Sequence, residues 1–173
     1  RGRIVAWGTG AVRDVSLKNL SVAPGLPVRP VGATLRNLDL RFTNAPVAVP
    51  TVDLSGNLTV VAGGAITEAA GGVRVNGISS FSTGASPITL LDGANHFTGA
   101  VSATNTGANA IALTDSGGTV LDAVSTANNL TVNAVGIAQS ASGVSVGGAA
   151  AFNAGTGSID LSLAPGNLFG TGV

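Results

Sequence analysis

The chain has 173 residues, no cysteine, no methionine and a formal net charge of zero, from 8 basic and 8 acidic side chains. Balanced charge argues against nucleic-acid binding, missing cysteine excludes a disulfide framework, and no apolar run approaches the roughly 20 residues of a membrane-spanning helix. Glycine supplies 26 residues, about twice the usual share. Valine, isoleucine, threonine, serine and alanine fill most of the rest, which favours strands and turns over helices.

Residues 1–53 differ in composition from the rest of the chain. They carry a net charge of +4, from seven basic and three acidic side chains, and they hold five of the seven prolines. We predict irregular, mildly basic coils here. Asn19 and Asn37 already stand before a leucine, as in the later repeats, so we expect one continuous solenoid rather than two domains.

Residues 54–173 contain a long internal repeat. Asn57-Leu58-Thr59-Val60 recurs 72 positions later as Asn129-Leu130-Thr131-Val132. Self-similarity at a fixed period predicts a repeating architecture. The further matching pairs are 71 or 72 positions apart: Ile66 and Ile137, Val73 and Val144, Val75 and Val146, Phe81 and Phe152, Ile88 and Ile159, Leu90 and Leu161, Asn95 and Asn167, Phe97 and Phe169.

A shorter repeat lies inside the long one, and it is marked by asparagine followed within two residues by a large apolar side chain. Most steps are 18 to 20 residues, and four steps make the 72-residue unit. We therefore predict about nine coils of 18 to 20 residues, with Leu58 and Leu130 at the same place in the cross-section. We interpret the asparagines as a structural turn ladder, each bonding to the asparagine of the next coil: Asn19, Asn37, Asn57, Asn76, Asn95, Asn109, Asn129 and Asn167.

Short runs alternate apolar and other residues, as in Leu58-Thr59-Val60, Val73-Arg74-Val75 and Ile88-Thr89-Leu90. A period of two sends one side chain inward and the next outward, as in a strand. Each run ends within a few residues at Gly, Asn, Ser or Pro, and no amphipathic helical stripe is present. The pattern predicts an all-β parallel β-helix, or β-solenoid, whose strands pair with their equivalents one coil away, at about 4.8 Å.

Candidates for catalysis are few. β-Helix enzymes that cleave polysaccharides gather acidic and basic side chains on one outer face, and Asp92, Asp115 and Asp122 could gather in this way, with His96 as the only histidine. A role in turns and strand edges explains these aspartates more simply. A metal site needs several ligands at suitable spacing, so we expect no enzyme activity and no catalytic, metal or cofactor site.

Several segments resemble a known family. Residues 57–67, 88–101 and 110–115 are similar to repeats of filamentous-haemagglutinin-type exoproteins, and residues 12–20 are similar to the segment that often precedes such repeats. The resemblance implies a right-handed β-helix shaft on a bacterial surface. It also implies two-partner secretion, in which an outer-membrane transporter exports the protein.

We therefore expect a structural and adhesive shaft, a piece of a much longer secreted surface protein. Its expected partners are host or neighbouring-cell surfaces, including their glycans, and the outer-membrane transporter during export. Uncapped strands would also allow self-association into fibres. The alternative is a polysaccharide-binding or polysaccharide-cleaving β-helix protein. The lack of cysteine fits passage through an oxidising periplasm, and neither nucleic-acid binding nor membrane insertion is expected.

Overall fold

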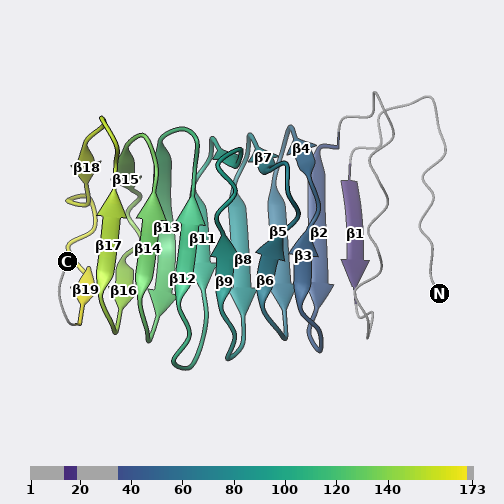
Figure 1. Cartoon of the computed structure of the whole chain (residues 1–173), viewed down its shortest axis with the longest axis horizontal. Coiled ribbons are helices and arrows are strands. Elements are labelled where there is room, and N and C mark those ends of the chain that lie inside the picture. Colours follow the sequence, from purple (N-terminus) through teal and green to yellow (C-terminus); the bar gives the residue numbers. More distant parts are fainter. Residues whose placement is uncertain (1–13, 19–34, 171–173) are drawn as a thin grey trace.

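The structure, a computed structural model, describes residues 14–18 and 35–170. Within these ranges the regular elements are β-strands, and no helix is long and apolar enough to span a membrane. The paired strands are all parallel and lie side by side along a rod that runs from β1 to β19 (Figure 1). In Figure 1 the chain rises through the front strands and descends through the rear ones as it advances, which makes the coil right-handed. The predicted all-β parallel solenoid is confirmed.

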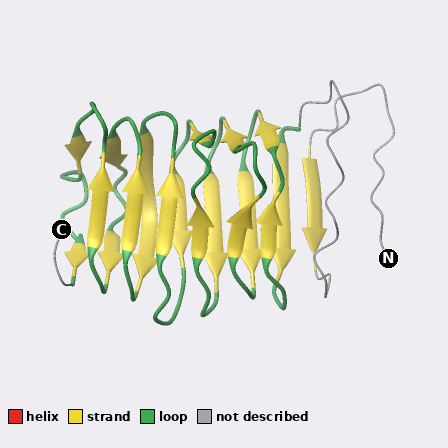
Figure 2. Ribbon diagram, viewed as in Figure 1, coloured by secondary structure: helices red, strands yellow, loops and turns green. Residues whose placement is uncertain are grey.

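Each coil has three faces, which the chain visits in a fixed order, and Figure 2 shows them as strands joined by short loops. Face 1 contains β1 (Asp14–Lys18), β2 (Asn37–Phe42), β5 (Leu58–Ala62), β8 (Ser79–Thr83), β11 (Val101–Thr104), the end of β13 (Thr119–Thr126), β16 (Val144–Val146) and β19 (Leu168–Phe169). Face 2 contains β3 (Val47–Val49), β6 (Ile66–Glu68), β9 (Ile88–Leu90), β12 (Ile111–Thr114), β14 (Leu130–Asn133) and β17 (Ala150–Asn153). Face 3 contains β4 (Val52–Leu54), β7 (Val73–Val75), β10 (His96–Phe97), the start of β13, β15 (Ile137–Gln139) and β18 (Ile159–Asp160).

Strand β13 turns the corner between two faces. Its residues 119–121 pair with β15 on face 3, and its residues 124–126 pair with β16 on face 1. The pairing of β11 with β13 shifts register between Val101 and Ala103, at the same corner. A bulge of this kind bends a strand locally, which lets one long strand serve two faces.

The coils are somewhat longer than the sequence suggested. Paired residues in neighbouring coils are 20 positions apart for Leu38 and Leu58, and 21 apart for Leu58 and Ser79. The described residues therefore form about seven coils rather than the expected nine. Residues 37–54 already make a complete coil, β2–β3–β4, continuous with those that follow.

Inward side chains form columns along the rod axis, because the strands stack in register. Fully burying one Val, Leu, Ile or Phe side chain stabilises the fold by roughly 1.5–3 kcal/mol, so the core draws its stability from many similar contributions. The alternation read from the sequence is confirmed by the burial pattern of the strands. The main column of face 1 comprises Leu40, Val60, Phe81, Ala103, Val124 and Val144, and that of face 2 comprises Val47, Ile66, Ile88, Ile111, Leu130 and Ala150.

The long repeat relates strands on different faces. Leu58 lies in β5 on face 1, whereas Leu130 lies in β14 on face 2. The expectation that these leucines occupy the same place in the cross-section is therefore wrong. Strands β2 to β11 make one repeat of ten strands, which is three coils and one extra strand. Because 72 residues are not a whole number of coils, each repeat begins one face further round the rod.

Packing contacts survive this rotation. Phe81 and Phe97 meet edge to face, with ring centroids 6.0 Å apart and an interplanar angle of 78°. Their counterparts Phe152 and Phe169 meet at 5.9 Å and 79°, although the first pair joins faces 1 and 3 and the second joins faces 2 and 1. Residues of one repeat thus pack against one another in the same way on any face.

The inward columns predict that the same substitution has different effects on stability at a buried and at an exposed isoleucine in equivalent repeat positions. Ile88 is fully buried, whereas Ile159 is 47% exposed. Ile88→Asp should lower the free energy of unfolding by roughly 3 to 5 kcal/mol, because it buries an unpaired charge. Ile159→Asp should have a much smaller effect. Equilibrium urea unfolding of both variants measures the difference, and equal losses would contradict this account of the core.

Candidate functional site

Asparagines of the turn ladder stand at the corners of the rod and join adjacent coils. The Oδ1 atom of Asn37 accepts from the backbone N–H of Asn57 (2.7 Å), and that of Asn57 accepts from Ile78 (2.9 Å). Asn129 repeats the contact of Asn57 on the next face, accepting from Ala149 (3.0 Å). These side chains bond to the backbone of the neighbouring coil, which differs from the predicted bond to another asparagine.

Glycine makes these corner contacts sterically possible. A Cβ atom on Gly77 would lie 2.2 Å from Oδ1 of Asn57, and one on Gly148 would lie 2.4 Å from Oδ1 of Asn129. Distances below 3.0 Å are not sustained by real Cβ atoms. The corner therefore needs an asparagine in one coil and a glycine above it in the next.

Asn95 and Asn167 form a second kind of corner contact, directed to the preceding coil. Oδ1 of Asn95 accepts from Val73 (2.8 Å) while its Nδ2 donates to Glu68 Oε2 (2.7 Å). Asn167 likewise accepts from the backbone N–H of Val144 (2.9 Å), and its Nδ2 donates to Oε1 of Gln139 (3.0 Å). Gln139 stands 71 positions after Glu68, so the whole contact is carried round the rod by the repeat.

The remaining predicted ladder residues behave differently. Asn76 is exposed, and its backbone N–H donates to Leu54. Asn109 offers its backbone carbonyl to Asn105 Nδ2 (2.9 Å) and Thr126 Oγ1 (2.7 Å). Asn19 lies outside the described residues. The asparagines thus mark corners on three faces of the rod instead of one line along it.

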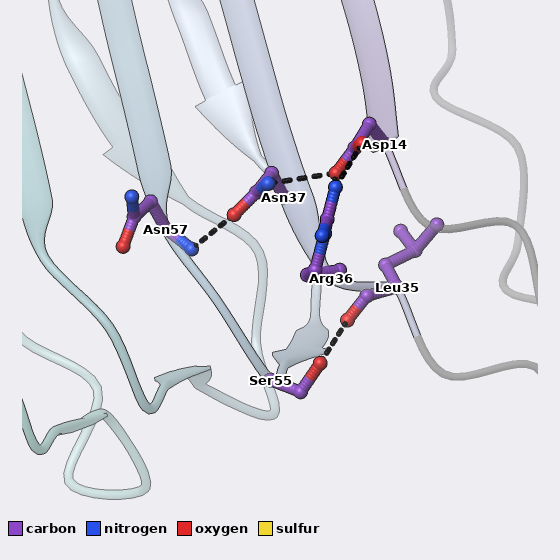
Figure 3. A network of polar contacts seen from close by, with 6 residues as sticks. All are labelled: Asp14, Leu35, Arg36, Asn37, Ser55 and Asn57. Carbon is purple, nitrogen blue, oxygen red and sulfur yellow. Dashed lines mark hydrogen bonds and ion pairs between the residues drawn. The ribbon is translucent and has the colours of Figure 1, made fainter.

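Figure 3 shows the polar network that joins β1 to the following coil. Arg36 donates to both carboxylate oxygens of Asp14, at 3.1 and 2.6 Å, and Asn37 Nδ2 donates to the same carboxylate at 2.7 Å. The Arg36 and Asp14 side chains are about half exposed, so their ion pair contributes little to stability. Its geometry instead orients β1 against β2.

The three aspartates weighed as catalytic candidates are held by separate partners. Asp92 accepts from the backbone N–H groups of Ala94 and Gly71, which lower its pKa. Asp122 lies in β13, where the hydroxyls of Ser140, Ser142 and Ser102 lower its pKa to about 2. Within residues 14–18 and 35–170, no group of three or more His, Asp or Glu side chains could hold a metal ion.

Asp115 and His96 are brought together. Nδ1 of His96 lies 3.4 Å from Oδ1 of Asp115, whose side chain is only 3% exposed. Burial raises the pKa of Asp115, opposed by hydrogen bonds from the backbone N–H groups of Gly117 and Phe97 and by the charge of His96. The contact orients the imidazole ring and leaves Nε2 as the nitrogen available to a ligand.

A polar row on face 3, which contains the charged side chains of Asp53 and Arg74 and the imidazole of His96, was missed by the sequence interpretation. Asp53 pairs in register with Arg74, and Arg74 with His96, so the three side chains follow one another outward across three coils. Their repeat counterparts, 71 or 72 positions later, are the uncharged Ser125, Ser145 and Leu168.

The fold does not require the charges of this face 3 row, because the same structural positions accept neutral residues. Inward neighbours, in contrast, stay apolar: Val73 has the counterpart Val144, and Phe97 has Phe169. A position-by-position comparison of the two repeats could have identified the face 3 row from the sequence. We take Asp53, Arg74 and His96 as the candidate functional surface.

Comparison with known proteins identifies a repeat family. The family model described as "Repeats of unknown function (DUF5649)" matches residues 35–104 and 108–173, well over half of the chain. The first match holds β2 to β11 and the second holds β12 to β19. The first match therefore coincides with the ten-strand repeat, and the second begins at β12, the strand equivalent to β2. No curated protein and no solved structure matches the chain.

The corner contacts predict different costs for two asparagines. Asn95 is fully buried, and Asn95→Ala would leave the N–H of Val73 without its acceptor. We expect a loss of about 1 to 3 kcal/mol in the free energy of unfolding. Asn76→Ala is the matched control, because Asn76 is exposed, and it should change stability by less than about 0.5 kcal/mol. Similar losses in both variants would contradict the assigned roles.

Asp122 predicts a specific acid sensitivity. Its pKa in the folded protein is lowered from 3.8 to about 2, so its stabilising contribution is present above pH 4 and is lost as the pH falls towards 2. We expect this loss to be roughly 1 kcal/mol after solvent screening is allowed for. Asp122→Asn should show a correspondingly shallower decline when urea unfolding is measured between pH 5 and pH 2. Identical pH profiles of the two proteins would refute the assignment.

Proposed function

The chain belongs to the family of repeats described as DUF5649, and we propose that it is a structural and adhesive shaft segment of a large secreted bacterial surface protein. The observation that carries the proposal is the continuous stack of parallel coils. Such a rod holds a distal binding region at a fixed distance from its anchor, and it offers long lateral faces to other surfaces.

Rigidity along the axis supports the role of a shaft. On faces 1 and 2, strands between the ends of the rod pair with their equivalents in two neighbouring coils, as β5 does with β2 and β8. The asparagine contacts add bonds between coils at the corners. Bending the rod would break several of these bonds at once, so the coils transmit force along the axis.

The lateral faces support adhesion through shallow contacts. On face 1 the outward residues Ser82, Thr104, Ser125 and Ser145 follow one another in register over four coils. Their hydroxyl groups donate and accept hydrogen bonds without carrying charge. An extended polymer with many hydroxyl groups, such as a glycan, could lie across such a row.

Secretion is part of the proposal. The resemblance of residues 88–101 and 110–115 to repeats of filamentous-haemagglutinin-type exoproteins supports export by two-partner secretion through an outer-membrane transporter. Absence of cysteine from the chain fits that route, since thiols would be oxidised in the periplasm. The proposed partners after export are glycans and surfaces of host or neighbouring cells.

A second candidate function is binding or cleavage of a polysaccharide at one defined site. It is favoured by the face 3 row, where Arg74 lies beside His96, and by the orientation of His96 through Asp115. Cleavage by acid and base would need two such groups about 5 to 10 Å apart across the substrate. Asp115 and His96 are in direct contact, which suits orientation of one group better than attack from two sides.

Glycan arrays and cell-binding assays test whether the face 3 row contacts a polysaccharide, as the second candidate function requires. The double variant Arg74→Ser and His96→Leu introduces the residues of the second repeat, so its melting temperature should match that of the wild type. Binding should weaken about tenfold, equivalent to 1.4 kcal/mol, if the row contacts the ligand. Ser80→Ala, which also introduces the residue of the second repeat at Ala151, is the matched control on face 1.

Two outcomes would change the proposal. Lack of any binding by the wild type would leave a spacer without adhesive function. Release of oligosaccharides that Asp115→Asn abolishes would establish the enzymatic alternative.

A further inference from the structure

The second repeat ends with an apolar surface that the first repeat keeps covered. Ile159 is 47% exposed, whereas its counterpart Ile88 is fully buried. Phe152 and Phe169 are only partly buried, whereas Phe81 and Phe97 are each 1% exposed. The residues are of the same type and come from equivalent strands, so the difference reflects what lies above them.

The structure shows what covers this surface in the first repeat. Strand β11 pairs with β8 in parallel, placing Val101 on Ser79, and β12 pairs with β9, placing Ile111 on Ile88. The following segment reaches β10, where the N–H of Ser116 donates to the carbonyl of Asn95 (2.8 Å). Strand β12 is the first strand of the second family match. The end of one repeat is thus an established interface for the start of the next.

The equivalent strands of the second repeat have the same geometry. Within the described part of the chain, strands β17 and β18 each have one open edge, unlike β8 and β9, whereas β19 has a single strand partner, as β10 does. Among the described residues, β17 pairs only with β14, β18 only with β15 and β19 only with β16. The rings of Phe152 and Phe169 already hold the arrangement seen for Phe81 and Phe97. The surface therefore has the same side-chain arrangement without a covering coil. Figure 1 shows these strands at the end of the rod.

We propose that β17, β18 and β19 form a docking surface for the start of another repeat of this family, stacked in parallel and turned by one face. The first strand of the docked repeat would pair with β18 on face 3, as β12 pairs with β9 on face 2 and β2 lies on face 1. The proposal rests on the proposed shaft function, because it names the partner that continues the rod.

This docking rule determines how a longer array presents its surface. Successive repeats begin on faces 1, 2 and 3, so an outward residue returns to the same face only after three repeats, or ten coils. Contacts made by equivalent outward residues of neighbouring repeats would therefore point in three directions around the shaft. A polar row such as Asp53, Arg74 and His96 would form a local patch and not a line along the rod.

The test is an extension of the 173-residue chain by a copy of residues 102–173 directly after Val173. Val173 then takes the place of Val101, at the spacing of 72 that also relates Phe97 to Phe169. The extended protein should unfold in one transition, at a higher temperature than the original chain. Hydrogen exchange at β17 and β18 should slow at least tenfold, because their open edges become paired as those of β8 and β9 are.

One substitution made in both lengths provides the matched control. Ile159→Asp should shift the melting temperature of the original chain by no more than about 3 °C, since the side chain is exposed there. In the extended chain the same substitution should lower it by roughly 10 °C or more, because docking buries position 159. A lower melting temperature of similar size in both lengths would overturn the proposal.

An appended segment that stays unfolded, or that melts separately while exchange at β17 and β18 is unchanged, also overturns the proposal. If the long extension fails to express, a copy of residues 102–121 alone supplies the one covering coil, and the same Ile159→Asp comparison is made on it. Because these readouts concern stacking, their failure is distinguishable from a failure to bind glycans, which would concern the adhesive role alone.

Discussion

In-register stacking of parallel strands is the constraint on which the rest of this structure depends. A strand in the middle of the rod obtains its hydrogen-bond partners from the coils on either side, so every coil must present a strand of matching length at matching height. The same register places like side chains above one another and creates the apolar columns. Corner asparagines then satisfy backbone N–H groups where strands end and no ladder partner is available.

The step of one face per repeat follows from chain length and shows how little the three faces differ. A unit of ten strands cannot close on a three-sided rod, so each strand from β2 to β10 has its counterpart on the next face in the second repeat. The phenylalanine pair and the contacts of Asn95 and Asn167 keep their geometry through this rotation. Local packing within the repeat, more than its absolute position around the axis, therefore specifies the fold.

Internal repetition also separates structural from functional residues without any other protein for comparison. Val73 and Val144 face the core in equivalent strands, whereas the residues that follow them, Arg74 and Ser145, face solvent. A charge that one repeat has and the other lacks does not serve the fold. The orientation of His96 by the buried Asp115 is likewise not required by the fold, since the counterpart of Asp115 in the first repeat is Phe42 and that of His96 in the second is Leu168.

The sequence by itself determined the parallel solenoid, the inward columns and the corner role of Asn57, Asn95 and Asn129, because strand alternation and glycine-flanked turns are local properties that repeat with the chain. Only the tertiary structure decided which residues meet across coils. Asp115 and His96 are 19 positions apart in sequence, and nothing local reveals that one lies over the other. The tertiary structure also decided the length of each coil. The number of residues per coil depends on the few residues at each corner, which lie in loops and in the bulge of β13. That number decided that Leu58 and Leu130 lie on different faces.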